Sequence, residues 1–281
     1  MVRDFLLRHQ SPLTPEQWSR IDDLVVRTAR RQLVGRRLLP IYGPLGPGAL
    51  AVQIRKISPP ADAAIGLTGQ EEARIASEDH DFIPVPILYR DFAIHWRNIE
   101  QSRQFGIPLD LSQAAAAAAA VARREDELVF LGDQKLGHMG ILNASGRTIV
   151  PLGDWSKPAA AFNSIVSATT KLGTQGFFGP YAVVTSPGLF VHLNRVFDNT
   201  GVLEIDQIGR LARAGVFLSP VLPEPSAVVV SVGAENLDLA VAQDMITAYL
   251  QVENLNHHFR VFEAVTLRIK QASAIATLES S

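Results

Sequence analysis

The residues that most often do chemistry are scattered along this chain rather than grouped in motifs. It has no cysteine, which excludes a disulfide, a thiolate metal site and a cysteine nucleophile. Its seven histidines show no H-E-x-x-H or similar metal spacing, and the adjacent His257 and His258 would point to opposite faces of a strand. No G-x-S-x-G sequence occurs. We therefore predict no metal site and no enzyme activity, although a triad assembled from distant residues stays open.

Two local clusters have structural explanations. The G-x-x-G-x-x-G spacing at residues 173–179 lacks the dinucleotide fingerprint and the P-loop lysine, so we expect a turn. The acidic run at residues 125–127 ends a predicted helix beside Arg123 and Arg124. We expect these carboxylates to form ion pairs on the surface.

Composition narrows the class of protein further. A hydrophobic fraction of 47% in 281 residues is typical of a folded globular chain, and a net charge of −2 argues against a main task in binding nucleic acid. No apolar run is long enough to span a bilayer, and the first residues do not resemble a signal peptide. We predict a cytoplasmic protein with neither nucleic acid nor membrane as a partner.

The element that must anchor the N-terminal part is an amphipathic helix. Thr14 and Gln17 form a capping box, Pro15 suits the first helical position and Gly35 suits the C-cap. Apolar and small residues recur at helical spacing on one side, namely Trp18, Ile21, Val25, Thr28, Ala29 and Leu33. The arginines of this region indicate either the solvated side of the helix or a surface that binds a partner.

The rest of the chain mixes helices and strands without regular βαβ alternation, which predicts an α+β fold. An acidic excursion follows a predicted strand at residues 49–57, and a helix over residues 110–131 contains seven consecutive alanines. Other predicted helices span residues 93–104, 158–172, 188–196 and 202–214. Other predicted strands span residues 83–92, 181–185, 216–221, 227–232, 237–241, 245–252 and 258–269.

Several motifs in a fixed order resemble the encapsulin shell proteins, the linocin-like family of bacterial and archaeal nanocompartments. They are F-L-x-R-x-x-x-P-L-T-x-x-Q-W-x-x-I-D at residues 5–22, G-R-R at 35–37, G-P-x-G at 43–46, E-D-E-x-V-F-x-G at 125–132, G-P-Y-A-V-V at 179–184, V-V-S at 229–231 and Q-D-x-x-x-x-Y at 243–249. The chain departs from the family at residues 233–236, where G-A-E-N replaces R-G-G-D, and at Pro40, where the family has aspartate.

The resemblance implies the fold of tailed-phage major capsid proteins. Residues 1–48 would begin the peripheral domain, 49–83 would form the extension loop, 84–139 would carry the spine helix, 140–226 would form the axial domain, and 227–281 would return to the peripheral domain. Copies of the chain would assemble into an icosahedral shell that encloses a cargo enzyme.

The same resemblance implies two functional sites. A C-terminal targeting peptide of the cargo would dock on Leu33 and Arg36 of the N-terminal helix together with Leu237 and Leu239. A pore would be framed by Asp198, Asn199, Thr200 and Gly201, whose repeated carboxylate would favour cations; an ordinary surface turn is the competing interpretation.

The cargo implied by the family is a ferritin-like protein, a hemerythrin-like protein or a dye-decolorising peroxidase. No cofactor is expected, because the residues around Trp96 do not match the flavin-binding members. Two alternatives stay open: a phage or prophage major capsid protein, and a hydrolase or bacteriocin-like protein.

Overall fold

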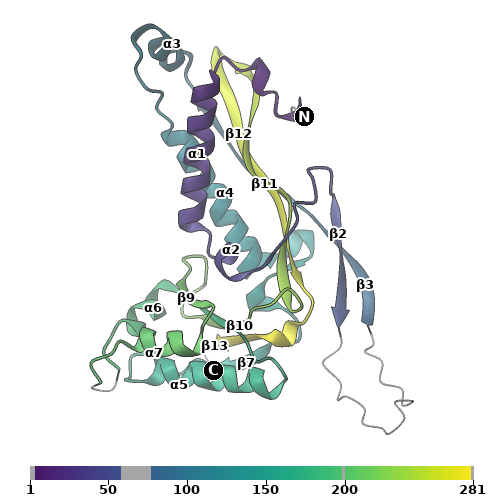
Figure 1. Ribbon diagram of the computed structural model, residues 1–281, viewed down its shortest axis with the longest axis vertical. Coiled ribbons are helices and arrows are strands. Elements are labelled where there is room, and N and C mark those ends of the chain that lie inside the picture. The colour runs from purple at the N-terminus through teal and green to yellow at the C-terminus, as the bar shows by residue number, and fades with distance from the viewer. Residues whose placement is uncertain (1–3, 58–76, 198–199, 280–281) are drawn as a thin grey trace.

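The computed structural model describes residues 4–57, 77–197 and 200–279. In these residues, two bodies lie one above the other, each with its own sheet, and a hairpin projects from one side (Figure 1). The N-terminal end lies in the upper body and the C-terminal end in the lower body. None of the helices in the described ranges is both long and apolar enough to cross a membrane.

A four-stranded sheet with the order β1-β11-β12-β4 supports the upper body. β11 and β12 form a long antiparallel hairpin, β12 pairs antiparallel with β4, and β1 runs parallel to the start of β11. The strands are β1 Ile41–Tyr42, β4 Ile87–Ile94, β11 Leu237–Glu253 and β12 Asn256–Ile269. The strands predicted at 237–241 and 245–252 are thus one strand, which register shifts at 241–243 and 243–246 interrupt without ending it.

Two helices, α1 Pro15–Gln32 and α4 Ser112–Phe130, lie along this sheet (Figure 1). The predicted capping box of α1 is confirmed: Thr14 Oγ1 accepts from the Gln17 amide at 3.3 Å, and Gln17 Oε1 accepts from the Thr14 amide at 3.0 Å. Trp18 on the apolar side of α1 meets Phe259 of β12 edge to face at 5.7 Å. Burial of such aromatic pairs is a large part of what fixes a helix on a sheet.

The alanine-rich helix α4 is the centre of the upper body. Ala114, Ala117, Ala118 and Ala122 are at most 3% exposed and recur at helical spacing. Because these side chains are small, α1 and the sheet can both pack closely against α4. The predicted helix at 110–131 is confirmed with slightly shorter bounds.

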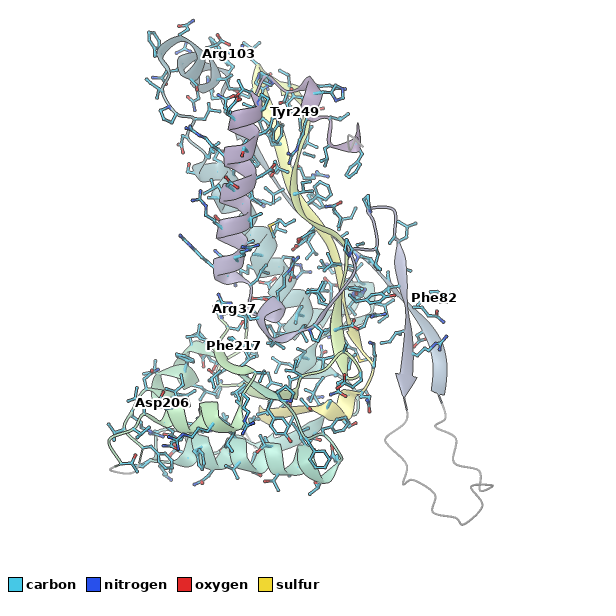
Figure 2. All side chains as sticks on the ribbon, viewed as in Figure 1. Arg37, Phe82, Arg103, Asp206, Phe217 and Tyr249 are labelled. Atoms are coloured by element: carbon cyan, nitrogen blue, oxygen red, sulfur yellow. The ribbon has the colours of Figure 1, made fainter. Side chains whose placement is uncertain are left out.

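Short elements complete the upper part and the link to the lower body. They are η1 Asp4–Leu6, η2 Arg8–Gln10, α2 Gly35–Leu38, α3 Trp96–Phe105, β5 Gly132–Asp133, η3 Gln134–Leu136, β6 His138–Met139 and η4 Ile141–Asn143. Arg103 of α3 and Tyr249 of β11 lie near the upper end, whereas Arg37 lies near the junction with the lower body (Figure 2).

The lower body contains a five-stranded sheet with the order β7-β13-β10-β8-β9. Its strands are β7 Thr148–Pro151, β8 Tyr181–Thr185, β9 Gly215–Leu218, β10 Ala227–Ser231 and β13 Ile275–Glu279, and its helices are α5 Ala160–Thr174, α6 Pro187–Leu193 and α7 Glu204–Leu211, with η5 Ala272–Ala274 before β13. A second apolar core lies between these helices and the sheet; it includes Trp155, Ile165, Leu193, Ile208 and Val229.

The two sheets do not follow the predicted boundary at residue 226. β10 and β13 pair with β8 and β7 in the lower sheet, whereas β11 and β12 belong to the upper sheet. The segment predicted as one return to the peripheral domain is therefore divided between both bodies, because strand pairing between distant segments leaves no local pattern in the sequence.

The projecting hairpin consists of β2 Ala51–Ile57 and β3 Ser77–Pro84, which pair antiparallel. Its base packs on the upper sheet through Val52 and through Val85 beyond β3, against Ala240, Ala242 and Ala264. Residues 58–76 of the predicted extension loop, with Glu71 and Glu72, lie outside the described residues. Phe82 on β3 is 71% exposed (Figure 2).

Candidate functional site

The turn between α1 and α2 is stabilised by hydrogen bonds to a carboxylate of α4. Leu33 leaves the helical conformation with φ −60° and ψ 113°, and α2 starts at Gly35. The amides of Val34 and Gly35 both donate to the Asp126 carboxylate at 2.9 Å. Asp126 thus satisfies backbone donors that the start of a helix leaves without an intrahelical partner.

Gly35 therefore does not have the predicted role of C-cap of the first helix. It lies in close contact with α4, where a Cβ atom would meet Asp126 Oδ1 and Val129 Cγ1 at 3.2 Å. The absence of a side chain lets α2 approach the carboxylate that caps it.

Burial makes Asp126 an unusual acid. The residue is 2% exposed, and desolvation raises its pKa to about 7, although the hydrogen bonds from Gly35 and Val34 act in the opposite direction. The carboxylate beneath the α1–α2 turn therefore changes its charge near neutral pH.

Arg36, on α2, binds three carboxylates from three other elements. Its Nε donates to both Glu125 oxygens at 2.9 Å, its Nη2 donates to Glu125 at 2.8 Å and to Glu263 at 2.7 Å, and its Nη1 donates to Asp244 at 2.6 Å. We call these four residues the Arg36 cluster. Burial lowers the pKa of Arg36, but Glu125, Glu263 and Asp244 outweigh it, and the pKa lies above its ordinary value.

The Arg36 cluster contains more negative than positive charge. The side chains of Glu125 and Glu263 are fully buried, whereas the side chain of Asp244 is 69% exposed. Burial and the nearby charge of Glu125 raise the pKa of Glu263 well above its ordinary value. Arg36, which the resemblance implied as a docking residue, consequently does not present a free positive charge.

The surface ion pairs predicted for residues 125–127 are found only for the last residue. Glu127 pairs with Arg123 at 3.0 Å and with Arg124 at 3.2 Å. The prediction is wrong for Glu125 and Asp126, which point inward because one side of α4 faces the α1–α2 turn and β12. A glutamate at 263 within the apolar strand F-E-A-V was the signal in the sequence for a buried partner.

An apolar strip lies between α1 and β11. Ala29 and Leu33 pack with Met245 of β11, and Val26, one turn earlier on the same face, is 39% exposed. The register shift between Gln243 and Ile246 lets two successive residues, Asp244 and Met245, both reach α1 and α2.

Ion pairs close both ends of this strip. At one end, Arg8 pairs with Asp22 of α1 at 2.7 Å and donates to the Thr247 carbonyl of β11 at 2.9 Å. At the other end lies the Arg36 cluster. Asp22 of α1 and its C-cap Leu33 are eleven residues apart, about 16 Å at helical rise, which matches about five residues of extended peptide.

The structure brings together only two of the four predicted docking residues. Leu33 and Arg36 lie at the same turn, but Leu237 and Leu239 are fully buried in the upper core. Leu239 lies about 20 Å along β11 from Met245. The accessible side chains beside Leu33 are Val26, Asp244 and Met245. Sequence reasoning missed Asp244 and Met245 because a register shift in β11 brings both of them to α1 and α2.

The predicted pore residues belong to the turn between α6 and α7. Thr200 Oγ1 donates to the Phe197 carbonyl at 2.6 Å and accepts from the Val202 amide at 3.3 Å, and Gly201 has a φ of 74°. Asp198 and Asn199 lie outside the described residues.

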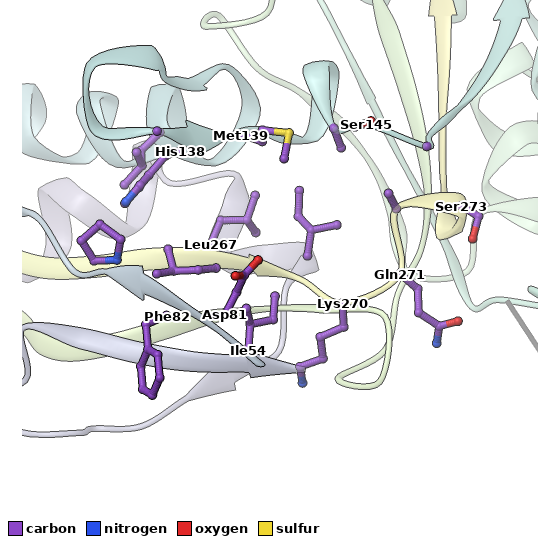
Figure 3. Close-up of a pocket in the computed structure, with 18 residues that line it drawn as sticks. Ile54, Asp81, Phe82, His138, Met139, Ser145, Leu267, Lys270, Gln271 and Ser273 are labelled. Atoms are coloured by element: carbon purple, nitrogen blue, oxygen red, sulfur yellow. The ribbon is translucent and has the colours of Figure 1, made fainter. Parts of the chain in front are cut away.

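A pocket of about 630 Å³ lies between the hairpin and the upper body (Figure 3). His138 and Met139 face it from one side, and Ile54 and Asp81 from the other. His138 is 7% exposed, neither of its ring nitrogens has a hydrogen-bond partner among the described residues, and burial lowers its pKa. Within the same ranges, no three histidine or carboxylate side chains are grouped as a metal site requires.

Comparison with known proteins identifies the relatives of the chain. A family model described as "Encapsulating protein for peroxidase" matches residues 3–266. The type 1 encapsulin shell protein EncA of Myxococcus xanthus is 50% identical over 279 residues, which is 99% of this chain and 97% of that protein. A diheme-cytochrome-encapsulin shell fusion protein of Kuenenia stuttgartiensis is 40% identical, over 95% of this chain and 74% of that protein.

Solved structures with the same fold include a virus-like particle and a phage capsid. The virus-like particle from Pyrococcus furiosus superposes with a TM-score of 0.77 at 19% identity, over 94% of this chain and all of that one. The capsid of Myoviridae phage XM1 gives a TM-score of 0.62 at 14% identity, over 86% of this chain and 89% of that one. The predicted α+β fold of tailed-phage capsid proteins is thereby confirmed.

Proposed function

The chain belongs to the encapsulin family as a shell protein, and from this premise we propose that its copies form an icosahedral compartment that recruits a cargo enzyme through the strip between α1 and β11. The relative that is 50% identical is a type 1 encapsulin shell protein, which favours a compartment over a phage capsid or a hydrolase. We further propose that the compartment lies in the cytoplasm.

The observation that carries the docking proposal is the apolar strip closed by charge at both ends, in which Ala29 and Leu33 are each 5% exposed and form the floor. Val26 and Met245 offer exposed or half-exposed apolar surface, and Leu33 lies between them and the Arg36 cluster. An extended peptide that lays alternate apolar side chains into a groove is a common mode of recognition. The proposal keeps Arg36 and Leu33 of the predicted site, because Leu33, although only 5% exposed, packs beside the accessible Met245. It drops Leu237 and Leu239, which have no exposed surface and lie in the upper core.

The charge of the strip specifies the peptide further. Because three carboxylates surround one guanidinium, the end of the strip at Asp244 is acidic. We expect a peptide with two apolar residues and a basic residue that pairs with Asp244. The cargo itself is proposed to be a ferritin-like protein, a hemerythrin-like protein or a dye-decolorising peroxidase, and a relative that is itself a fusion with a diheme cytochrome supports a redox-active cargo.

The test uses fluorescent proteins whose five-residue C-terminal tails carry two leucines and one arginine in every order. Each is co-expressed with the shell, and the particles are purified by size exclusion and checked by negative-stain electron microscopy. At least one tail should be packaged, and exchanging its arginine for glutamate should abolish packaging.

Matched variants locate the site. Val26→Glu and Met245→Glu should remove packaging while particles still form, whereas Val252→Glu, at an exposed valine near the far end of β11, should leave it unchanged. Packaging that survives both strip variants would refute the docking site, and a small oligomer without particles would refute the compartment.

We propose that the turn at residues 198–201 frames a pore. One carboxylate per copy around a symmetry axis favours cations. Asp198→Asn should slow the entry of a divalent cation into particles loaded with a metal-sensitive dye, and Asp206→Asn on α7 is the control. Equal entry rates in the three proteins would contradict the proposal.

A further inference from the structure

Two buried carboxylates face a single guanidinium beneath the α1–α2 turn. Glu125 and Glu263 both accept from Arg36 Nη2, at 2.8 and 2.7 Å, so these two oxygens lie within two hydrogen-bond lengths of each other. Neither carboxylate has exposed surface. Such a pair carries one negative charge in excess of what Arg36 neutralises.

The other charged groups around Glu125 and Glu263 do not neutralise this excess negative charge. Asp244 from β11 adds a third negative charge at Arg36 Nη1. On α4, Asp126 turns toward the Val34 and Gly35 amides, and Arg37 acts on Asp126. Among the described residues, Arg36 is the one cation paired with either Glu125 or Glu263.

We infer that Glu125 and Glu263 hold one proton between them, and that this proton keeps α2 closed on α4. With the proton bound, the summed charge of Glu125, Glu263 and Arg36 is zero. The remaining oxygen of Glu263, Oε1, is buried and accepts no hydrogen bond from the described residues, so the anionic form of this carboxyl is poorly stabilised and its protonated form is favoured. Loss of the proton leaves two anions in a space that water does not reach.

Movement of α2 away from α4 would lower the electrostatic cost of these two anions. α2 has only four residues, and its polar anchors to α4 are the bonds of Arg36 to Glu125 and of the Val34 and Gly35 amides to Asp126. When α2 lifts, water reaches Glu125 and Glu263 and the cost of burying like charges falls. Leu33 and Arg36 would move with it, and, if the proposed docking function holds, a bound cargo peptide would be released as the pH rises.

Hydrogen exchange in assembled particles tests the proton. We expect the protection of residues 33–39, corrected for the intrinsic pH dependence of exchange, to fall as the pH rises, by up to about tenfold per pH unit for the loss of one proton. Glu263→Gln, which imitates the protonated acid, should flatten this dependence, and Glu125→Gln is the second variant should the first fail to assemble. Asp126 titrates in all these proteins, so the comparison with wild type removes its contribution.

The control is Glu127→Gln on the exposed side of α4, which should keep the wild-type profile. Parallel profiles for wild type and Glu263→Gln, or a flat wild-type profile, would overturn the shared proton. Retention of the packaged fluorescent tail is measured on the same samples. If no tail is packaged at any pH while the exchange profiles still differ, the docking proposal fails and the proton stands; if tails are packaged but the profiles are parallel, the reverse holds.

Discussion

Removing Arg36 should expose how much the fold depends on this one cation. In Arg36→Met, a side chain of similar length keeps much of the packing but leaves Glu125 and Glu263 without a positive partner. Breaking a buried ion pair from one side costs about 3–5 kcal/mol. Since the two acids can relieve part of this by taking up a proton, and since the exposed Asp244 contributes little, we expect the lower end, about 3 kcal/mol.

The assay is thermal unfolding of assembled particles followed by tryptophan fluorescence at one fixed scan rate, because shell unfolding is coupled to disassembly. A loss of about 3 kcal/mol corresponds to a fall in Tm of about 6–12 °C for a chain of this size. Arg123→Met is the matched control, since Arg123 pairs with Glu127 on the surface and its loss should shift the Tm by less than about 2 °C.

A triple variant separates charge from packing. Arg36→Met combined with Glu125→Gln and Glu263→Gln removes both buried acids along with their partner, and should recover most of the lost Tm. A Tm of Arg36→Met within about 2 °C of wild type would refute the charge argument. A triple variant as unstable as the single one would show that Arg36 acts by packing instead.

Three further predictions follow from single contacts. Asp126 has a pKa of about 7 in the fold, so the stability that its protonated form contributes is present below about pH 4 and is lost as the pH rises through 7. The Tm of Asp126→Asn should therefore fall less between pH 5 and 8 than the Tm of wild type. Equal falls in Tm would contradict this. Gly43→Ala places a Cβ 2.3 Å from the Val241 carbonyl at a φ of 138°, so particle yield measured by size exclusion should collapse; a normal yield would show that β1 can shift. Trp18→Ala should lower the free energy of unfolding by about 3–5 kcal/mol, seen as a Tm loss of about 6–20 °C, because the ring is 7% exposed and packs on Phe259; a loss under about 2 °C would contradict its place in the core.

Local signals predicted the helices well. Thr14 and Gln17 mark the start of α1 because a capping box needs only residues three apart, and the alanine run marks α4 because helix propensity is a property of each residue. The resemblance of short ordered motifs to the encapsulins predicted the capsid fold, which no periodicity in the chain could have done.

Contacts between distant residues limited the prediction of the site. Asp126 caps a helix 91 residues earlier in the chain, and Glu263 pairs with Arg36 across 227 residues. Nothing near residue 126 distinguishes its side chain from the half-buried Glu127, which pairs with surface arginines. The register shift that turns both Asp244 and Met245 toward α1 is likewise a property of the paired strands, so the exposed side of the strip could not be read from β11 alone.

The position of β13 has a consequence for the order of events during synthesis. β13 lies between β7 and β10, yet it is translated after every other strand of its sheet. While the ribosome is still making β11 and β12, the lower sheet lacks an inner member and its two halves cannot meet. A nascent chain therefore cannot offer a finished lower body to another copy until β13 has emerged from the ribosome and paired with β7 and β10.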